Sequence, residues 1–451
     1  MEHVARQDGR WAAPAAAGPV RARLSIPGSK SMTNRALVLA ALADGPGTLA
    51  GPLHARDTLL MRAALTALGA TITDTHSYAA DPAGLPPSWH VTPGQPGADA
   101  RVDVGNAGTV LRFAPAVAAL TTVSTAFHGD ARAAERPVGP MLAALRELGA
   151  VIDDGGRGAI PFTVHGGGSV PGGAVTLDAS ASSQLVSGLL LAAPRFGKGA
   201  EIRHRGGRTP SAPHIAMTVA MLRDAGADVE TWTRESGTPA GAPDTWRVHP
   251  GAIGHHDVIV QPDLSNAVPF LAAALVTGGA VTIAGWPAAT AQPAAQILDL
   301  LTAFGAEWTL APGGLTVTGT GRIPPVTADL ADVSESATVA TALAALAGGP
   351  SRLTGIGHMR RHETDRLAAL ATEIGALGGD VTQLPDGLAI RPRPLRATGR
   401  PFASYDDHRM VMAAAVLGLA VPGLEVANAA TVGKTFPAFT QLWASMLEQA
   451  L

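Results

Sequence analysis

The sequence predicts an α/β protein built from six similar repeats of roughly 75 residues. Three observations lead to this prediction. An amphipathic helix with a glycine near its end recurs along the chain, a more apolar helix precedes each copy, and short β-rich runs lie between them. With 451 residues, the chain is too long for one hydrophobic core, so two or three domains are expected.

The amphipathic helices share the pattern apolar-x-x-Leu-x-x-apolar-Gly-Ala. The glycine supplies the left-handed residue that commonly ends a helix. Four segments fit the pattern closely, a fifth fits it loosely, and the C-terminal helix is a candidate for the sixth copy. In chain order the segments are 61–72, 141–152, 218–229, 297–308, 367–381 and 439–451.

The helices that precede these copies are apolar on nearly all sides, which is typical of buried helices. They are expected at 34–43, 109–120, 183–193, 265–276, 336–347 and 408–420. Short runs rich in β-branched residues, such as 257–261, 281–285 and 315–319, are expected to form strands between the helices.

Composition and charge exclude several classes of protein. The net charge of −3 argues against non-specific binding to nucleic acid or to a membrane surface, which needs a basic face. The absence of Cys excludes disulfides, thiolate metal sites and cysteine nucleophiles, and fits a cytoplasmic protein. Apolar runs such as 36–43 are too short to span a bilayer. Residues 1–23 contain no signal-peptide pattern and are expected to form a flexible leader before a first strand at 21–26.

Polar residues gather immediately before each buried helix. They lie at 28–35, 105–109, 178–184, 263–266, 329–336 and 405–409. A helix N-terminus has free N–H groups and a positive dipole end, so it attracts anions. Ordinary N-capping is an alternative explanation, and for 263–266 it is preferred. Capping alone does not require Lys30, Arg35, Gln184 and Arg409, so several helix ends are expected to converge on a substrate rich in phosphate and carboxylate.

Lys30 stands out because only three of the 33 Lys and Arg residues are Lys. Arg is a planar fork, whereas Lys is a compact point charge that can approach one reacting atom. A P-loop is excluded, because Ser29 separates Gly28 from Lys30 and Arg23 stands where the first glycine would be. Lys198 is interpreted as a surface residue, and Lys434 is the third lysine.

Seven motifs together resemble the 5-enolpyruvylshikimate-3-phosphate synthase family. In chain order they are PGSKSxxNRAL, GNAGT…R, ERPVGPML, SSQ, HETDRL, YDDHRM and GKTFP, from residue 27 to residue 437. The resemblance implies the two-domain enolpyruvyl transferase fold, with six βαβαββ repeats, three per domain, arranged like an inverted α/β barrel with pseudo-threefold symmetry. It also implies domains at 29–259 and at 1–28 plus 260–451, with the active site in the cleft between them.

The resemblance further implies a reaction. The 5-hydroxyl of shikimate 3-phosphate adds to C2 of phosphoenolpyruvate while C3 takes a proton, and loss of phosphate then gives an enol ether. The implied catalytic residues are Lys30, Glu335 and Glu363. The implied ligands of shikimate 3-phosphate are Lys30, Ser31, Arg35, Ser182, Ser183, Gln184, Ser211, Glu335 and His362. The implied ligands of phosphoenolpyruvate are Lys30, Gly108, Arg136, Gln184, Arg366, Arg409 and Lys434. No metal or organic cofactor is implied, and a monomer without nucleic-acid or membrane partners is expected.

The chain departs from the family pattern at four positions. Glu335 stands where many members have Asp, His362 where they have Lys, and His214 where they have Tyr. His358 replaces a frequent Asn and is not assigned to the site. His362 could be an imidazolium beside a substrate dianion or a neutral ring that gives a single hydrogen bond. His358 and His362 have metal-ligand spacing, but the neighbouring arginines 360 and 361 disfavour a cation.

Two other functions are compatible with parts of this pattern. UDP-N-acetylglucosamine enolpyruvyl transferases use the same donor, but that family usually carries a loop Cys and an Asn after the early Lys, where this chain has no Cys and has Ser31. A binding protein that has lost turnover is the other alternative. The presence of Lys30, Glu335 and Glu363 argues against it.

Overall fold

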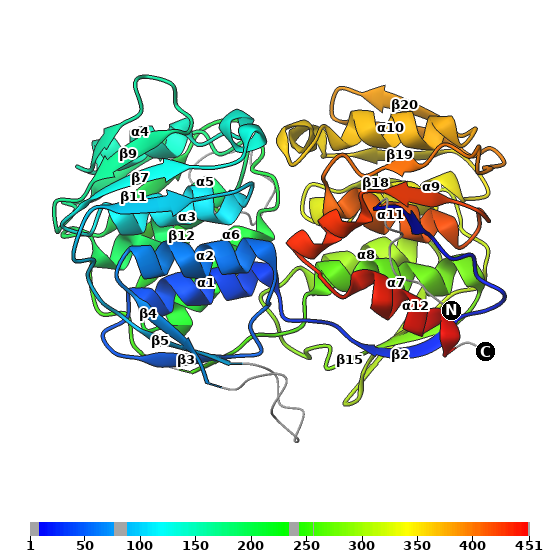
Figure 1. Ribbon diagram of the computed structural model, residues 1–451, viewed down its shortest axis with the longest axis horizontal. Coiled ribbons are helices and arrows are strands. Elements are labelled where there is room, and N and C mark those ends of the chain that lie inside the picture. The colour runs from blue at the N-terminus through cyan, green and yellow to red at the C-terminus, as the bar shows by residue number, and fades with distance from the viewer. Residues whose placement is uncertain (1–8, 76–87, 234–242, 256, 450–451) are drawn as a thin grey trace. The chain divides into compact units, whose positions relative to one another are not determined.

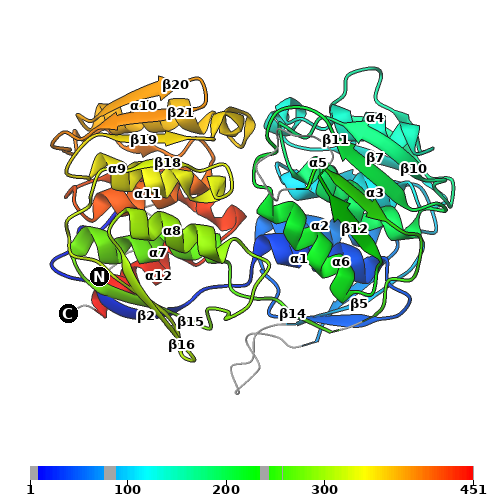
Figure 2. The ribbon, with the colours of Figure 1, turned by 180° about the vertical axis from the view of Figure 1, so that it is seen from behind.

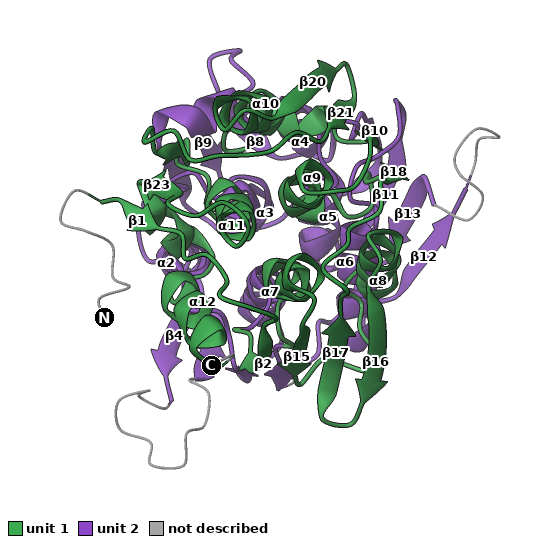
Figure 3. Cartoon of the chain, turned by 90° about the vertical axis from the view of Figure 1, so that its right-hand side faces the viewer, with its two compact units in different colours: residues 1–27, 261–451 green, residues 28–260 purple. Residues whose placement is uncertain are grey.

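The computed structural model describes residues 9–75, 88–233, 243–255 and 257–449. The chain divides into two compact units, shown in different colours in Figure 3. Unit 1 consists of residues 1–27 and 261–451, and unit 2 consists of residues 28–260. Within the described residues, each unit contains three central helices, three outer helices and three small sheets. Figures 1 and 2 show these elements from opposite sides.

The central helices occupy the places predicted for the buried helices. In unit 2 they are α1 (Lys30–Ala41), α3 (Gly108–Ala118) and α5 (Gln184–Ala192), and in unit 1 they are α7 (Leu264–Thr277), α9 (Ala337–Ala345) and α11 (His408–Gly418). Every residue of α3, α9 and α11 is buried. The apolar composition on all sides therefore has the predicted cause.

The outer helices overlap the predicted amphipathic segments. The first four begin two to five residues earlier than predicted, the fifth begins one residue earlier, and the sixth begins at the predicted residue. They are α2 (Arg56–Ala67), α4 (Gly139–Glu147), α6 (Pro213–Asp224), α8 (Ala294–Ala303), α10 (Arg366–Ala376) and α12 (Phe439–Glu448). Glycines follow five of them with the predicted positive φ: Gly69 (107°), Gly149 (103°), Gly226 (84°), Gly305 (86°) and Gly378 (94°). In Figure 3, α7, α9 and α11 are seen end-on inside the ring of outer helices of unit 1.

Five of the sheets have four strands with one common topology, in which the first strand pairs in parallel with the second and a hairpin completes the sheet. In unit 2 they are β14 (Val258–Ile259)–β3 (Gly47–Ala50)–β5 (Ser88–Thr92)–β4 (Thr71–Asp74), β6 (Ala100–Asp103)–β7 (Ser124–His128)–β9 (Phe162–His165)–β8 (Val151–Asp153) and β10 (Gly173–Leu177)–β11 (Ala200–His204)–β13 (Thr245–Val248)–β12 (Val229–Trp232). In unit 1 they are β16 (Glu307–Ala311)–β17 (Gly314–Thr318)–β15 (Ala280–Ala284)–β2 (Arg21–Ser25) and β18 (Thr327–Asp329)–β19 (Ser351–Thr354)–β21 (Gly387–Arg391)–β20 (Asp380–Leu384).

At each point where the chain passes from one unit to the other, the last strand before the crossing belongs to the unit that the chain is leaving. β2 directly precedes α1 in the sequence, yet it pairs in parallel with β15 of unit 1. β14 directly precedes α7, yet it pairs in parallel with β3 of unit 2. The first sheet of each unit is thus completed by a strand that is distant in sequence.

The sixth sheet departs from the repeat. It has three strands, β1 (Trp11–Ala12), β23 (Glu425–Ala427) and β22 (Phe402–Ala403), because no hairpin follows α12 within the described residues. β1 pairs antiparallel with β23, and the Trp11 side chain is 2% exposed and packs edge-on against Phe439. The predicted flexible leader is therefore wrong for residues 11–20, while residues 1–8 lie outside the described part.

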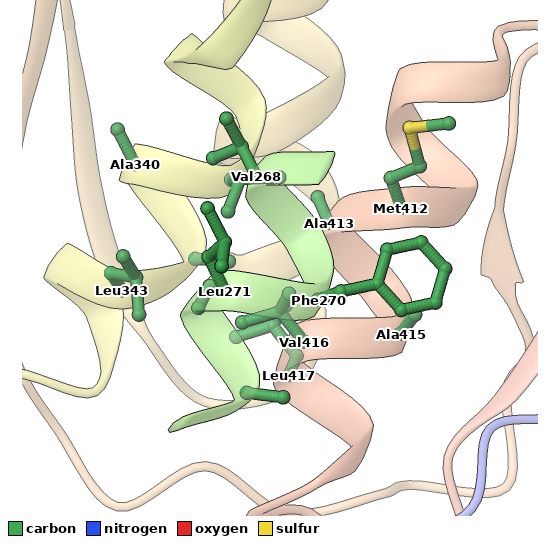
Figure 4. Close-up of a cluster of buried hydrophobic side chains, with 14 of the residues drawn as sticks. Val268, Phe270, Leu271, Ala340, Leu343, Met412, Ala413, Ala415, Val416 and Leu417 are labelled. Carbon is green, nitrogen blue, oxygen red and sulfur yellow. The ribbon is translucent and has the colours of Figure 1, made fainter. Parts of the chain in front are cut away.

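The core of unit 1 shows why so much Ala is needed. α7 contributes Val268, Phe270 and Leu271, α9 contributes Ala340 and Leu343, and α11 contributes Met412, Ala413, Ala415, Val416 and Leu417 (Figure 4). The small alanine side chains let the three helices approach closely while the larger side chains fill the spaces between them. This packing fixes the helix N-termini, which carry the polar residues.

Candidate active site

The N-terminal turns of the three central helices of unit 2 lie together. Asn34 Nδ2 of α1 donates to Thr109 Oγ1 of α3 at 2.7 Å, and Arg112 Nη1 of α3 donates to Gln184 Oε1 of α5 at 2.8 Å. The fold therefore brings Lys30, the first residue of α1, to the same end of the unit as the first residues of α3 and α5.

Lys30 is held beside a buried carboxylate. Its Nζ lies 3.6 Å from Oδ2 of Asp57, which belongs to α2 and is 2% exposed. Ser29 caps α1, with Oγ accepting from the Met32 N–H at 3.4 Å. The ammonium is thus placed at the positive end of a helix dipole, where further negative charge is favoured.

Arg35 is a buried cation whose hydrogen-bond partners among the described residues are all neutral. Burial lowers the pKa of Arg35 to about 9, so the guanidinium stays charged at neutral pH. Its acceptors come from α1, α5 and α6 and are Ser31 O (2.9 Å), Ser187 Oγ (3.3 Å), His214 O (3.0 Å) and Thr218 Oγ1 (2.7 Å). The Phe113 ring lies 5.3 Å from the guanidinium carbon. Arg35 ties three helices together and adds positive charge beneath the N-terminus of α1.

Gly108 lies against two guanidinium groups. A Cβ at this position would come within 2.5 Å of Arg136 Nη2 and 2.8 Å of Arg112 Nη1. Arg136 Nη1 donates to the Asn106 carbonyl at 2.6 Å, and Arg112 Nε donates to the Pro137 carbonyl at 2.9 Å. The absence of a side chain at 108 thus leaves space for cations at the start of α3.

The serines predicted to bind shikimate 3-phosphate lie at the starts of α5 and α6. Ser182 Oγ accepts from the Gln184 N–H at 3.3 Å, and Ser183 precedes α5 and is 4% exposed. Ser211 precedes α6 and has a left-handed backbone, with φ of 52°. A non-glycine residue in this region is uncommon and marks a constrained turn.

Unit 1 contains a buried network of four charges. Arg366 donates to Asp407 through Nε (2.7 Å) and Nη2 (3.1 Å), and to Glu363 Oε2 through Nη2 (2.9 Å). Lys434 Nζ donates to Glu363 Oε1 at 2.9 Å. Burial alone would lower the pKa of Arg366, but the nearby charges of Asp407 and Glu363 raise it above its usual value. The predicted phosphoenolpyruvate ligand Arg366 is therefore charged.

Arg409 connects a second carboxylate to the start of α7. Its Nη2 lies 3.3 Å from Glu335 Oε2 and donates to Ser265 Oγ at 2.7 Å, and its Nη1 donates to the Ser265 carbonyl at 3.0 Å. Ser265 Oγ in turn donates to Asp263 Oδ1 at 2.7 Å. The segment 263–266 therefore does more than the predicted capping, because it also holds a predicted ligand.

The two histidines of 358–362 are neutral in this structure. Burial, together with the charge of Arg366, lowers the pKa of His362 well below 6.5. Arg366 Nη1 lies 3.1 Å from His362 Nδ1, which must accept this hydrogen bond because Arg has no acceptor. Burial also lowers the pKa of His358 to about 4. Of the two alternatives for His362, this geometry favours the neutral ring.

Comparison with known proteins decides the family. The family model described as EPSP synthase (3-phosphoshikimate 1-carboxyvinyltransferase) matches residues 14–443. A 3-phosphoshikimate 1-carboxyvinyltransferase of Kocuria rhizophila is 51% identical over 447 residues, which cover 98% of this chain and 97% of that protein. The chain belongs to the EPSP synthase family. The resemblance seen in the seven motifs is thereby confirmed.

Solved structures support the fold of this family member. An EPSP synthase from Acinetobacter baumannii has a TM-score of 0.75 at 23% identity, with 97% of this chain and 98% of that chain covered. The enolpyruvyl transferase NikO from Streptomyces tendae has a TM-score of 0.69 at 17% identity, with 96% of each chain covered. The predicted fold class is confirmed, and at such identities these likenesses speak for the fold alone.

Structure adds residues to the site that motif matching did not assign. Arg112 lies inside the GNAGT…R motif and orients the Gln184 amide, while Asp407 of the YDDHRM motif binds Arg366. Both residues stand in motifs of the sequence, but the sequence does not show which residues they bond to. Ser265 gave no signal beyond its place near a helix start. The assignment of individual site residues to the two substrates stays a prediction.

The described residues contain neither a metal-binding cluster nor a membrane-spanning helix. Among the described residues, no group of three or more His, Cys, Asp or Glu side chains could hold a metal ion. His358 lies in the 3-10 turn η4 (Gly357–Arg361), and His362 directly follows this turn. Their ring centroids are 5.3 Å apart. Nowhere in the described ranges is a helix both long and apolar enough to cross a bilayer.

Proposed function

We propose that the protein transfers the enolpyruvyl group of phosphoenolpyruvate to the 5-hydroxyl of shikimate 3-phosphate, giving 5-enolpyruvylshikimate 3-phosphate and phosphate. The observation that carries this proposal is the cluster of cations at the N-terminal ends of the central helices, in a chain that belongs to the EPSP synthase family. Two phosphates and a carboxylate need such a set of donors.

The two units supply different parts of the proposed site. Unit 2 supplies Lys30, Arg35, the start of α3 and the start of α5. Within the described part of the chain, the buried guanidinium of Arg35 donates to neutral acceptors only. Such a cation favours a nearby anion, which supports binding of shikimate 3-phosphate there. Unit 1 supplies Arg366, Arg409 and Lys434 for phosphoenolpyruvate.

The proposed chemistry is an addition followed by an elimination. Glu335 accepts the proton of the 5-hydroxyl as the hydroxyl oxygen bonds to C2 of phosphoenolpyruvate, and Glu363 gives a proton to C3. Loss of a proton from C3 and of phosphate from C2 then restores the double bond. Lys30 stabilises the negative charge that develops between the substrates. Arg366 and Lys434 stabilise the ionised form of Glu363, so its role as an acid requires these cations to turn toward the substrate.

We also propose that residues 29–259 and 1–28 plus 260–451 act as domains that enclose the substrates between them. The predicted ligands are divided between the two units, so both must reach the same pair of molecules. Closure would exclude water and strengthen the polar contacts. Solution scattering should show compaction on adding shikimate 3-phosphate, and an unchanged radius of gyration would contradict the divided site.

The acceptor distinguishes this function from its alternatives. The fold is shared with another enolpyruvyl transferase, so phosphate release from phosphoenolpyruvate should be measured with each acceptor. Release should require shikimate 3-phosphate and should not occur with UDP-N-acetylglucosamine. Substrate binding without phosphate release would indicate a binding protein. Phosphate release with the nucleotide sugar would indicate a UDP-N-acetylglucosamine enolpyruvyl transferase.

The remaining expectations are a cytoplasmic monomer that needs no cofactor and binds no nucleic acid. The absence of Cys supports the cytoplasmic location, and the net charge of −3 supports the absence of nucleic-acid binding. Activity that survives extensive dialysis against a metal chelator is the expected result.

A further inference from the structure

A strained turn precedes α11. Tyr405 and Asp406 are consecutive and both have left-handed backbones, with φ of 53° and 55°. This conformation is disfavoured for residues that carry a Cβ, so the surrounding structure must hold it in place. The turn ends at Asp407, whose side chain caps α11 by accepting from the Arg409 N–H at 2.9 Å.

A buried carboxylate on α10 holds the first half of this turn. Glu373 is 1% exposed and lies two helical turns after Arg366. It accepts from the Tyr405 hydroxyl (2.7 Å), from Arg400 Nη2 (2.7 Å) and from the Ala403 N–H (3.1 Å). Burial and this hydrogen bond raise the pKa of the Tyr405 phenol, so it remains the donor at neutral pH.

A second residue ties the turn to the segment that carries Lys434. Asn428 Nδ2 donates to Asp406 Oδ1 at 2.5 Å, and the Asn428 carbonyl accepts from Ser404 Oγ at 3.2 Å. Asn428 is itself left-handed, with φ of 48°. It directly precedes the 3-10 segment η5 (Ala429–Lys434), which ends at Lys434.

The turn thus bonds directly to two of the three predicted phosphoenolpyruvate cations of unit 1 and is tied to the segment that ends at the third. Asp407 binds the Arg366 side chain of α10 and the backbone N–H of Arg409 at the start of α11. Asn428 connects the turn to the start of η5. Because α10 bonds both Asp407 and the loop before it, a shift of the turn would move Arg366 and Arg409. The bond between Asn428 and Asp406 would pass the shift on to the segment that ends at Lys434.

We propose that the turn 404–407 is the positioning element for Arg366, Arg409 and Lys434, with Glu373 and Asn428 as positioning residues. This inference rests on the proposed function, because it assumes that these cations bind phosphoenolpyruvate. It assigns no contact with substrate to the positioning residues, and it gives the two left-handed residues a functional reason.

The test uses two variants that remove a tie without forcing the backbone. Tyr405→Phe removes the hydroxyl that Glu373 accepts from, and Asn428→Gly removes the side chain at a position where glycine adopts the positive φ freely. Each should raise KM for phosphoenolpyruvate about three- to thirtyfold, the range seen for residues that act through others. KM for shikimate 3-phosphate should remain within about twofold of the unaltered protein, since its predicted ligands lie mostly in unit 2.

Two further variants serve as controls. Asp406→Asn keeps an oxygen that can accept from Asn428 and tolerates a left-handed backbone, so it should behave nearly as the unaltered protein. Asp380→Asn breaks the exposed pair between Asp380 and Arg393 (2.8 Å), which lies in the same unit and far along the chain from the turn. Because this pair involves none of the residues that hold the turn, Asp380→Asn should leave both KM values unchanged.

The outcomes separate this inference from the proposed function. If the unaltered protein does not turn over phosphoenolpyruvate with shikimate 3-phosphate, the proposed function fails and the inference fails with it. If the unaltered protein is active, the inference is overturned when Tyr405→Phe and Asn428→Gly lower only the melting temperature, or when they raise both KM values equally. A selective rise for phosphoenolpyruvate supports it.

Discussion

Replacing Asp407 by Asn should destabilise unit 1 strongly, because it removes one charge from a buried network. Asp407 is 0% exposed and accepts two hydrogen bonds from Arg366 and one from the Arg409 N–H. Asn has nearly the same shape and can still accept from this N–H. The substitution therefore tests the charge with little change in packing.

The magnitude follows from the charge balance of the network. Two cations, Arg366 and Lys434, face two carboxylates, Glu363 and Asp407. After the change, one carboxylate remains for two buried cations. An ion pair separated by about 4 Å at an effective dielectric constant of about 20 is worth about 4 kcal/mol. Breaking buried pairs typically costs about 3–5 kcal/mol, so we expect a loss in this range.

Thermal unfolding of the full chain measures this loss. For a domain of this size, about 3–5 kcal/mol corresponds to a fall in melting temperature of about 6–20 °C. Asp365→Asn is the matched control, because Asp365 also caps a helix start and also pairs with an arginine, Arg360, at 3.1 Å. That pair is partly exposed, so its loss should cost at most about 1 kcal/mol.

Equal shifts for Asp407→Asn and Asp365→Asn would refute the reasoning. They would mean that the charge of Asp407 is not needed to balance Arg366 in the folded state. A large shift for Asp407→Asn that persists at high salt would agree with burial, since salt screens buried pairs much less than exposed ones.

Four further predictions concern the site and the N-terminal strand. Lys30→Arg should nearly abolish turnover in a well-folded protein, because a guanidinium is too bulky at the reacting centre; near-normal turnover would remove the special role of this lysine. Acidification should destabilise the protein, because His358 and His362 are neutral when folded but bind protons at about pH 6.5 when unfolded. The free energy of unfolding should thus fall by up to about 1 kcal/mol per histidine between pH 6.5 and 5.5. It can be measured by denaturant titration at each pH, and a His358→Asn variant with the same pH dependence as the unaltered protein would contradict this. Because His362 is neutral in the folded protein, the affinity for shikimate 3-phosphate should depend little on pH between 6 and 9, both in the unaltered protein and in His362→Lys. Calorimetric titration measures this affinity, and a flatter pH dependence in the variant alone would indicate an imidazolium at position 362. Trp11→Ala should cost about 3–5 kcal/mol in denaturant unfolding if β1 is part of the core, and no loss would speak against that placement.

Sequence alone determined the features that depend on local pattern. Apolar helices and amphipathic helices could be placed because each sets its own period, and the glycines at their ends could be interpreted because a positive φ is a property of single residues. The seven motifs also identified the family, since motif letters in a fixed order require no knowledge of contacts. These signals located every central and outer helix.

Tertiary structure decided which distant residues meet. The pairing of β2 with β15 and of β14 with β3 could not be derived from local pattern, because adjacency in sequence favours the opposite assignment. Trp11 looked like part of a leader, because its burial depends on β23 and Phe439, more than 400 residues away.

The state of the site residues depends on their neighbours in the same way. His362 could not be assigned a charge from the sequence, because its pKa is set by burial and by Arg366. Asp407 could be recognised as a cap from its position before α11, but its pairing with Arg366 arises only when α10 and α11 pack together. The spacing of apolar residues is a property of the sequence itself, whereas burial and charge pairing depend on contacts that form only when the chain folds.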